Sequence, residues 1–280
     1  NFDGLRLDAI DQIRDPSENE LLLELAKKVR REFTYRPRHL VTEDNRNLAS
    51  LHARENGEVK LFTAEWNDDF HNAAHVLLTG ETEGYYEDYS EEPASLIARC
   101  LAEGYAYQGE PSKHLGGKLR GEVSTDLPTT AFINFLQNHD QIGNRALGER
   151  LTELAAPEPL KALTAILLLS PHIPMMFMGE EWGERRPFQF FTDFHGDLAK
   201  AVREGRRSEF SHFKSFGKDP KAIPDPNAVR TFNASRIDWS QRESDEGKAC
   251  LGNVSALLAL RREHIVPHLD DSASSPGVVL

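Results

Sequence analysis

The sequence predicts an α/β protein built around a parallel sheet. Short apolar runs of strand length alternate along the chain with segments whose apolar residues recur at helical spacing. That order implies parallel strands joined by right-handed crossovers, either in an open doubly wound sheet or in part of a barrel. With 280 residues, 39% of them hydrophobic, the chain can bury the core that either architecture needs.

Five strands are expected, each a short apolar run that stops at a turn signal or a polar cluster. They cover residues 2–10, 38–42, 59–66, 131–137 and 173–178. In the first strand, the period of two places Arg6 and Asp8 on one face and apolar residues on the other. One strand therefore presents a cation and a carboxylate together.

Helices are predicted between the strands from apolar spacing and from end signals. They cover residues 21–33, 67–80, 93–107, 157–170, 195–216 and 247–262, whereas residues 217–245 are expected to be irregular. The segment Asp15–Glu18 is a start signal for the first helix, and Asn67 and Gly80 are typical first and last residues of the second. Residues 81–128 also contain a Gly-rich excursion, which we expect to be a functional loop or a lid.

Composition excludes several classes of partner. A formal charge of −12 and an isoelectric point near 5.4 disfavour binding to a nucleic-acid backbone, which needs a concentrated basic surface. No apolar run approaches the roughly 20 residues that span a bilayer, and no signal-peptide pattern opens the chain. Cys100 and Cys250 form no Cys-x-x-Cys motif, so neither a disulfide framework nor a thiolate zinc site is indicated. We therefore expect a cytoplasmic protein without nucleic-acid or membrane partners.

Three carboxylates follow predicted strands that are far apart in sequence: Asp8, Glu43 and Asp140. Functional side chains at the ends of several strands favour a barrel, whose active site is built at the carboxyl face. No Gly-x-Gly-x-x-Gly or Gly-x-x-x-x-Gly-Lys-Ser/Thr motif follows a strand, which disfavours nucleotide binding, and no cofactor is expected.

Two carboxylates that flank a sugar linkage can break it, one as nucleophile and one as proton donor. Asp8 suits the nucleophile, since the neighbouring Arg6 favours its ionised form. Glu43 suits the acid, because a longer side chain in a drier pocket can keep its proton. Asp140 would then stabilise positive charge on the sugar ring, while His139 could hold ring hydroxyls.

Each assignment has a simpler alternative. A lone acidic residue at a strand end is commonly a helix N-cap or a surface group, and Arg6 could be only a structural partner of Asp8. Three such carboxylates in corresponding positions favour the site. For His71 and His75, four residues apart on a helix, no third ligand is evident, so no metal site is predicted. The charged run 203–209 is expected to be a solvated helix face.

Three motifs carry a family resemblance. The segment Gly4–Ala9, the pair Glu43 and Asp44 after an apolar strand, and the segment Asn138–Asp140 resemble the second, third and fourth sequence regions of the α-amylase superfamily, glycoside hydrolase family 13. The resemblance runs from residue 2 to about residue 263. It implies strands 4 to 8 of a (β/α)8 TIM barrel, with the nucleophile Asp8 after strand 4, the acid/base Glu43 after strand 5 and the transition-state stabiliser Asp140 after strand 7.

Further motifs, at residues 66–75, 77–86, 141–145 and 190–207, resemble a branch of that superfamily that releases trehalose. That branch hydrolyses the α-1,4-glucosidic bond adjacent to the trehalose end of maltooligosyl-trehalose. The resemblance implies a retaining double displacement, with the two reacting carboxyl groups about 5 to 5.5 Å apart. The implied substrate-binding residues are Arg6, His139, Trp66, Asp69, Gln141, Phe191 and Asp193.

Alternatives remain open for individual residues and for the whole chain. Trp66 could pack in the core as well as stack on a sugar, and core packing is also open for Phe190 and Phe191. The chain could be another superfamily enzyme that acts on maltodextrins, such as an amylase or a glucan branching enzyme. It could also be a carbohydrate-binding fragment without chemistry.

The resemblance divides the chain into a partial catalytic barrel at residues 1–265 and a tail at residues 266–280, which leads toward a missing C-terminal β domain. The first three barrel strands are expected to be missing from this chain. An open half-barrel would expose strand edges and apolar faces, so the 280 residues alone are expected to be inactive. The expected partners are a maltooligosaccharide substrate and the missing N-terminal part of the same protein.

Overall fold

The computed structural model describes residues 2–18, 20–210 and 223–269. The chain divides into two compact units. The first unit contains Asn1–Leu136, Ala162–Met175 and Leu257–Leu280, and the second contains Gln137–Lys161 and Met176–Ala256. The predicted tail beyond residue 269 lies outside the described residues.

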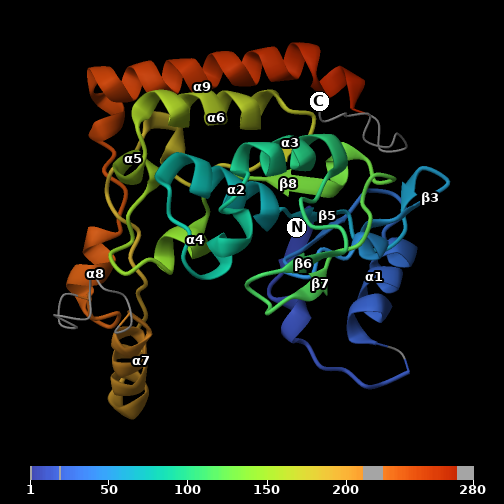
Figure 1. Ribbon diagram of the computed structural model, residues 1–280, viewed down its shortest axis with the longest axis horizontal. Coiled ribbons are helices and arrows are strands. Elements are labelled where there is room, and N and C mark those ends of the chain that lie inside the picture. Colours follow the sequence, from blue (N-terminus) through green and yellow to red (C-terminus); the bar gives the residue numbers. More distant parts are fainter. Residues whose placement is uncertain (1, 19, 211–222, 270–280) are drawn as a thin grey trace. The chain divides into compact units, whose positions relative to one another are not determined.

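The first unit is built on a five-stranded parallel sheet with the strand order β1-β2-β5-β8-β9. Figure 1 labels β5 and β8, two neighbouring strands of this sheet. The strands are β1 (Gly4–Leu7), β2 (His39–Thr42), β5 (Ala64–Trp66), β8 (Phe132–Asn134) and β9 (Ile173–Pro174). All four neighbouring pairs are parallel, from Gly4 opposite His39 at one edge to Asn134 opposite Pro174 at the other. The predicted α/β class and parallel sheet are confirmed, and the strands lie in chain order.

The predicted strand at residues 59–66 was wrong in its first half. Residues Glu58–Val59 form β4, which pairs antiparallel with β3 (Arg54–Glu55) in a separate hairpin. Asn56 and Gly57 join the two strands with φ angles of 54° and 80°. Asn-Gly is the preferred pair for a turn with two positive φ angles, so the sequence did contain a hairpin signal here.

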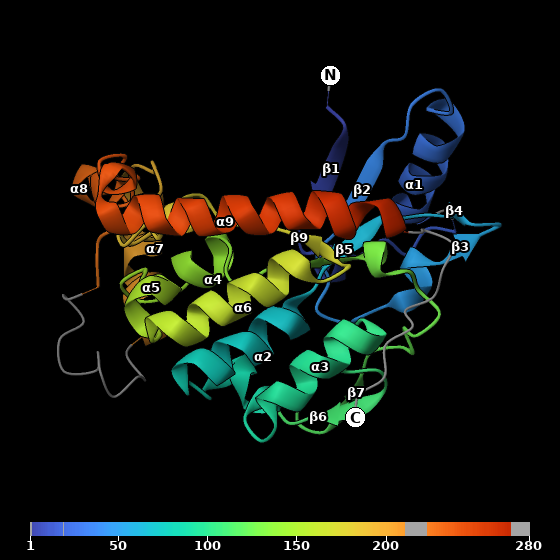
Figure 2. The same ribbon diagram turned by 90° about the horizontal axis from the view of Figure 1, so that it is seen from above.

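Three helices belong wholly to the first unit: α1 (Leu21–Glu32), α2 (Asp68–Thr79) and α3 (Pro93–Glu103). Leu22 and Ala26 of α1 pack with Leu40 of β2 in a buried apolar cluster. Helices α2 and α3 lie side by side (Figure 2). The predicted bounds of α2 are confirmed, because the side chain of Asn67 accepts from the backbone N–H of Phe70 and Gly80 ends the helix with a φ of 72°.

The excursion predicted at residues 81–128 contains α3 and a two-stranded hairpin. The hairpin consists of β6 (Glu110–Ser112) and β7 (Lys118–Arg120). It therefore has regular structure of its own.

The second unit consists mainly of helices. It holds α4 (His139–Gly143), α5 (Leu151–Leu154), α7 (Gly196–Glu209) and α8 (Val229–Ala234). Helix α8 lies in a region predicted to be irregular, whereas the predicted end of α7 at residues 211–216 lies outside the described residues. Two helices, α6 (Pro157–Leu169) and α9 (Asp245–His264), contribute residues to both units.

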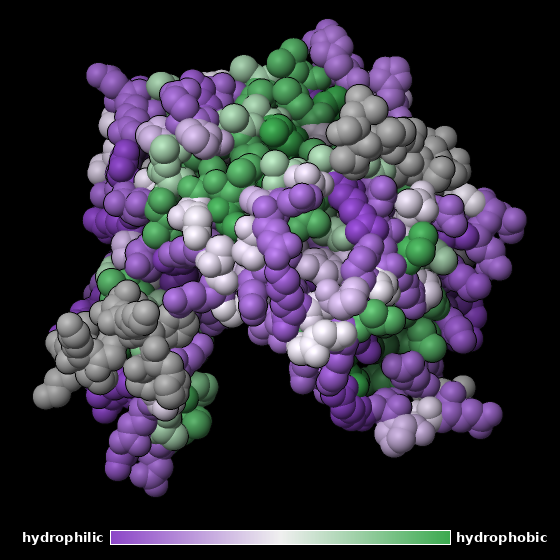
Figure 3. Space-filling view, viewed as in Figure 1, coloured by the Kyte–Doolittle hydropathy of each residue, from purple (hydrophilic) through white to green (hydrophobic). Residues whose placement is uncertain are grey.

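Hydrophobic side chains gather on one face over α6 and α9 (Figure 3). In the parts of these helices that belong to the first unit, the exposed apolar residues are Ile166 and Leu169 of α6 and Leu258 and Leu260 of α9. Exposed apolar patches are typical of contact surfaces. Among the described residues, no helix combines the length and the apolar composition that crossing a bilayer requires.

Candidate active site

Arg6 brings two of the predicted catalytic carboxylates together. Its Nη1 donates to Asp8 Oδ1 at 2.5 Å, and its Nη2 lies 2.6 Å from Glu43 Oε2. The second contact has the distance of an ion pair but not the angles of a hydrogen bond. Because β1 and β2 are adjacent and parallel, Asp8 and Glu43 leave the sheet at the same edge and share one guanidinium.

The backbone fixes this pair. The N–H of Glu43 donates to Leu7 O, and the N–H of Ile10 donates to Glu43 O, both at 3.1 Å. Ala9 has a φ of 43°, in the left-handed region, and its N–H donates to Glu43 Oε2 at 2.9 Å. The turn after β1 therefore fixes the side chain of Glu43 through the Ala9 N–H and leaves the side chain of Asp8 exposed.

The two carboxylates differ in exposure. The Asp8 side chain is 76% exposed, whereas that of Glu43 is 17% exposed. Asp8 is therefore the carboxylate of this pair that solvent or a ligand can reach more readily.

Trp66, at the end of β5, packs under Arg6. The guanidinium carbon lies 4.0 Å from the indole centroid, a cation–π contact, and the indole also meets Phe135 edge-on at 5.8 Å. One face of the indole is therefore taken by Arg6. Of the two roles considered for Trp66, packing within the protein accounts for these contacts.

Asp69, which was predicted to bind substrate, is held by a set of contacts within the first unit. It is fully buried in α2. Its Oδ2 accepts from the Asn47 amide at 2.8 Å and from the backbone N–H groups of residues 106–107 at 2.8 and 2.9 Å. Its Oδ1 pairs with Arg120 Nη2 at 2.8 Å and accepts from the Tyr89 hydroxyl. These contacts tie the excursion at residues 81–128 to α2.

A buried polar network behind Glu43 was missed from the sequence. Glu65 of β5 accepts from the Thr42 hydroxyl at 3.1 Å and from the Tyr105 hydroxyl at 2.9 Å, and the His52 imidazole lies 2.9 Å from the same Thr42 oxygen. Burial raises the pKa of Glu65 well above its usual range and lowers that of His52 to about 4. The only available signal was a glutamate inside an apolar run.

Asp140 belongs to the second unit, in the short helix α4. The side chain of Asn138 caps this helix by accepting from the backbone N–H groups of Asp140 and Gln141, both at 2.9 Å. Asn144 donates to Asp140 Oδ1 at 3.3 Å. The Asn-His-Asp motif therefore combines an N-cap with an acidic residue in the first helical turn, while His139 is exposed.

Arg206 of α7 holds the far end of α4 and is the one buried residue in the run 203–209, which is otherwise exposed or half-buried as expected. Its side chain is buried, and its Nη2 donates to Gly143 O at 2.6 Å and to Arg145 O at 2.8 Å. Its guanidinium also lies over the rings of Phe190 and Phe210.

Phe191 and Asp193, both predicted to bind substrate, differ in their surroundings. Phe191 lies within an aromatic cluster, 5.7 Å from the Phe188 ring and 5.2 Å from the Phe232 ring. Asp193 is exposed. Core packing, the alternative considered for Phe191, accounts for its ring contacts.

His71 and His75 have partners within the first unit. His71 Nδ1 lies 2.6 Å from Leu136 O, and burial lowers its pKa to about 3. His75 Nε2 lies 2.8 Å from Glu81 Oε2, and its ring stacks on Tyr86. Across the described part of the chain, no group of three acidic, histidine or cysteine side chains could hold a metal ion.

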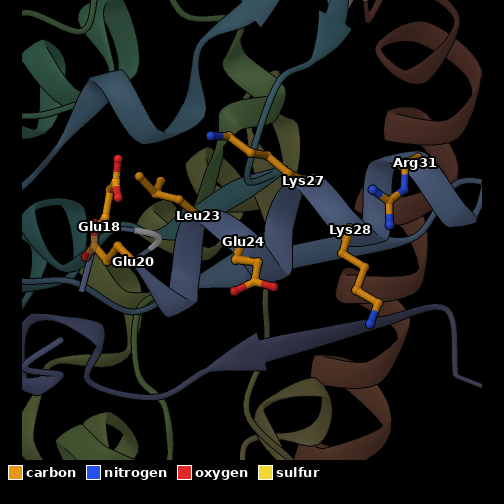
Figure 4. Close-up of a pocket in the computed structure, with 7 residues that line it drawn as sticks. All are labelled: Glu18, Glu20, Leu23, Glu24, Lys27, Lys28 and Arg31. Atoms are coloured by element: carbon orange, nitrogen blue, oxygen red, sulfur yellow. The ribbon is translucent and has the colours of Figure 1, made fainter. Parts of the chain in front are cut away.

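A surface depression along α1 contains none of the predicted site residues (Figure 4). Its acidic side chains come first along the chain, from Glu18 to Glu24, and its basic side chains follow, from Lys27 to Arg31. In Figure 4 these side chains spread along the helix instead of converging. This mixture is typical of a solvated helix face.

Comparison with solved structures gives the class of protein. A putative α-amylase from Salmonella typhimurium superimposes with a TM-score of 0.92 at 57% identity, over 98% of this chain and 46% of that one. The ligand-free cyclic α-maltosyl-(1→6)-maltose hydrolase of Arthrobacter globiformis shares the fold alone, with a TM-score of 0.50 at 14% identity over 96% of this chain and 41% of that one. The chain shares its fold with members of the α-amylase superfamily of glycoside hydrolases.

Curated relatives narrow the similarity within that class. The chain is 41% identical to the malto-oligosyltrehalose trehalohydrolase of Deinococcus radiodurans over 96% of its length, and 36% identical to that of Saccharolobus solfataricus over 94%. The chain is therefore homologous to malto-oligosyltrehalose trehalohydrolases along almost its whole length. It spans less than half the length of these relatives, 43% of each. No protein-family model matches the chain.

Proposed function

We propose that the chain carries catalytic groups of a glycoside hydrolase that cleaves the α-1,4-glucosidic bond adjacent to the trehalose end of maltooligosyl-trehalose. The homology to malto-oligosyltrehalose trehalohydrolases supports the substrate. The observation that carries the chemistry is the Arg6 guanidinium between Asp8 and Glu43 at the ends of adjacent parallel strands.

In the proposed reaction, a carboxylate oxygen of Asp8 attacks the anomeric carbon of the maltooligosyl unit. The bond from that carbon to the trehalose oxygen breaks, and Glu43 transfers its proton to this oxygen, so that trehalose leaves. Glu43 then takes a proton from water, whose oxygen attacks the same carbon and releases Asp8. Two displacements at one carbon retain the α configuration.

The other predicted residues support these steps in the proposal. Arg6 orients Asp8 through the hydrogen bond from its Nη1 to Asp8 Oδ1. Asp140 would stabilise positive charge on the ring in the transition state, and His139 and Gln141 would bind hydroxyls. Asp193 remains a candidate for the trehalose end, since it is exposed.

The proposal includes the architecture around the site. The five strands in the order β1-β2-β5-β8-β9 would be strands 4 to 8 of a (β/α)8 barrel, with residues 1–265 in that domain and residues 266–280 as a tail. A cytoplasmic location is part of the same proposal, and it is supported by the free thiols of Cys100 and Cys250.

A second function is favoured by one observation. The structure that superimposes with a TM-score of 0.92 is described as a putative α-amylase. An enzyme of that kind would hydrolyse bonds of ordinary maltodextrins and would need no trehalose end.

Product analysis separates the two functions. Two substrates with the same number of glucose units are compared, maltotriosyl-trehalose and maltopentaose. Each is incubated with the 280-residue chain and with an extended chain. The extension adds the part of the Deinococcus relative that the 280 residues do not cover. From the extended chain we expect free trehalose with the first substrate, initially together with α-maltotriose, and little turnover of the second. The 280 residues alone should turn over neither substrate. Asp8→Asn should lower the rate by about 10³-fold or more, because it removes the nucleophile.

Two outcomes would contradict this assignment. Comparable hydrolysis of maltopentaose would favour the amylase. Binding of both substrates without turnover by the extended chain, unchanged in Glu43→Gln, would favour a carbohydrate-binding module.

A further inference from the structure

The second unit contains an apolar depression of about 360 Å³ that is lined by none of the predicted site residues. Two tryptophans line it, the buried Trp182 and Trp239, which is 62% exposed. Their ring centroids are 5.2 Å apart. Ile237 and Leu251 add apolar surface to the depression. A largely exposed indole beside a fixed apolar wall is unusual for a group that gains by burial.

The backbone around this depression is held in place. Gly179 and Gly183, with φ angles of 94° and 73°, flank the 3-10 turn that carries Trp182. The backbone N–H of Asp238, the residue before Trp239, donates to Glu184 Oε2 at 2.8 Å, and its carboxylate pairs with Arg186 at 3.3 Å. The indole of Trp239 is thus presented on an ordered segment, which lowers the entropy cost of binding.

The polar groups of the depression indicate the chemistry of its occupant. Glu181 and Arg242 supply one anion and one cation, so the lining has no net charge and favours a neutral ligand. Carboxylate and guanidinium groups accept from and donate to hydroxyls. The C–H face of a glucose ring packs on the negative face of an indole, while its hydroxyls point outward to such groups.

We infer that this depression is a second carbohydrate-binding site, in which a glucosyl unit of an α-1,4-glucan stacks on Trp239. The choice of α-glucan rests on the proposed function, whereas the site itself does not. A second contact would hold a long substrate near the protein and raise its effective concentration. Trp239 takes no part in bond cleavage.

The test is a titration of the chain with maltoheptaose, in an Asp8→Asn background that prevents turnover. Calorimetry gives the affinity, and hydrogen exchange of residues 237–251 reports the site. Trp239→Ala should weaken binding at this site at least about 10-fold, which corresponds to roughly 1.4 kcal/mol of lost stacking. Trp239→Phe should retain most of the affinity because it keeps an aromatic face. The exposed position of Trp239 means that neither change should disturb folding, which thermal unfolding checks.

The inference is overturned if the parent chain does not bind maltoheptaose, or if Trp239→Ala leaves both the affinity and the exchange protection unchanged. The proposed function fails separately. In that case the extended chain with Asp8 intact releases no trehalose, while Trp239-dependent binding persists.

Discussion

Arginine side chains organise the surroundings of the predicted acidic residues. Arg6 joins Asp8 to Glu43, Arg120 neutralises Asp69, and Arg206 holds the carbonyl groups at the end of the helix that contains Asp140. A guanidinium can serve several acceptors at once because its donors form a rigid fork. Arg6 is on the strand that Asp8 follows, whereas Arg120 and Arg206 lie on elements distant in sequence from Asp69 and Asp140.

Asp69 and Asp193 provide a matched test at this scale, since both were predicted to bind substrate. Asp69→Asn should lower the free energy of unfolding by about 3 kcal/mol, because it leaves the buried Arg120 charge without its partner. Asp193→Asn, at an exposed position, should change it by less than about 0.5 kcal/mol. Urea unfolding followed by circular dichroism measures both values. Equal stability of the two variants would show that the Asp69 network contributes little.

The two glycines that end α2 and α3 test how closely these elements pack. A Cβ at Gly104 would lie 2.2 Å from the Phe132 ring, at a φ of 100°, whereas a Cβ at Gly80 would meet nothing within 4 Å, at a φ of 72°. Gly80→Ala should cost about 1 kcal/mol for the left-handed backbone alone. Gly104→Ala should cost about 3 kcal/mol or more, because β8 must also move. The difference between their urea midpoints measures the packing contribution, and similar midpoints would contradict it.

Elements whose signals are local were predictable, and those that depend on distant contacts were not. Helix α2 was predicted to its end residues, because Asn67 and Gly80 act through hydrogen bonds and φ angles within a few residues. The strand predicted at residues 59–66 is shorter in the structure, because the Asn56-Gly57 turn pairs Val59 with Arg54 in a hairpin.

The same distinction applies to the site. Arg6 and Asp8 are two residues apart, so the strand period predicted that they face the same side. The burial of Asp69 depends on Asn47 and Arg120, which are distant in sequence, and the burial of Arg206 depends on the carbonyl groups after α4. Such partners cannot be read from a single stretch of residues.

At the scale of the whole molecule, the two units carry buried groups with opposite pH dependence. In the first unit, burial lowers the pKa of His52 and His172 to about 4 and that of His71 to about 3. In the second unit, burial raises the pKa of Glu180 to about 7. Glu65 of the first unit also has a raised pKa, and it opposes the three histidines there.

We expect acid to destabilise the first unit before the second. The three histidines are neutral when folded but titrate near pH 6.5 when unfolded, so the stability they supply is lost as the pH falls from 6.5 toward 4, by up to about 2 kcal/mol each at pH 5. Glu180 has the opposite effect, because a carboxyl whose pKa is raised in the folded state loses stability as the pH rises from about 4.5 to 7. Hydrogen exchange at pH 7 and pH 5 should therefore show faster opening of the first unit and unchanged or slower opening of the second at the lower pH.

His172→Leu should reduce the effect on the first unit by about a third, and it is the cleanest variant because neither ring nitrogen of His172 has a hydrogen-bond partner among the described residues. Parallel acid destabilisation of both units, unaltered by His172→Leu, would show that other groups control the response.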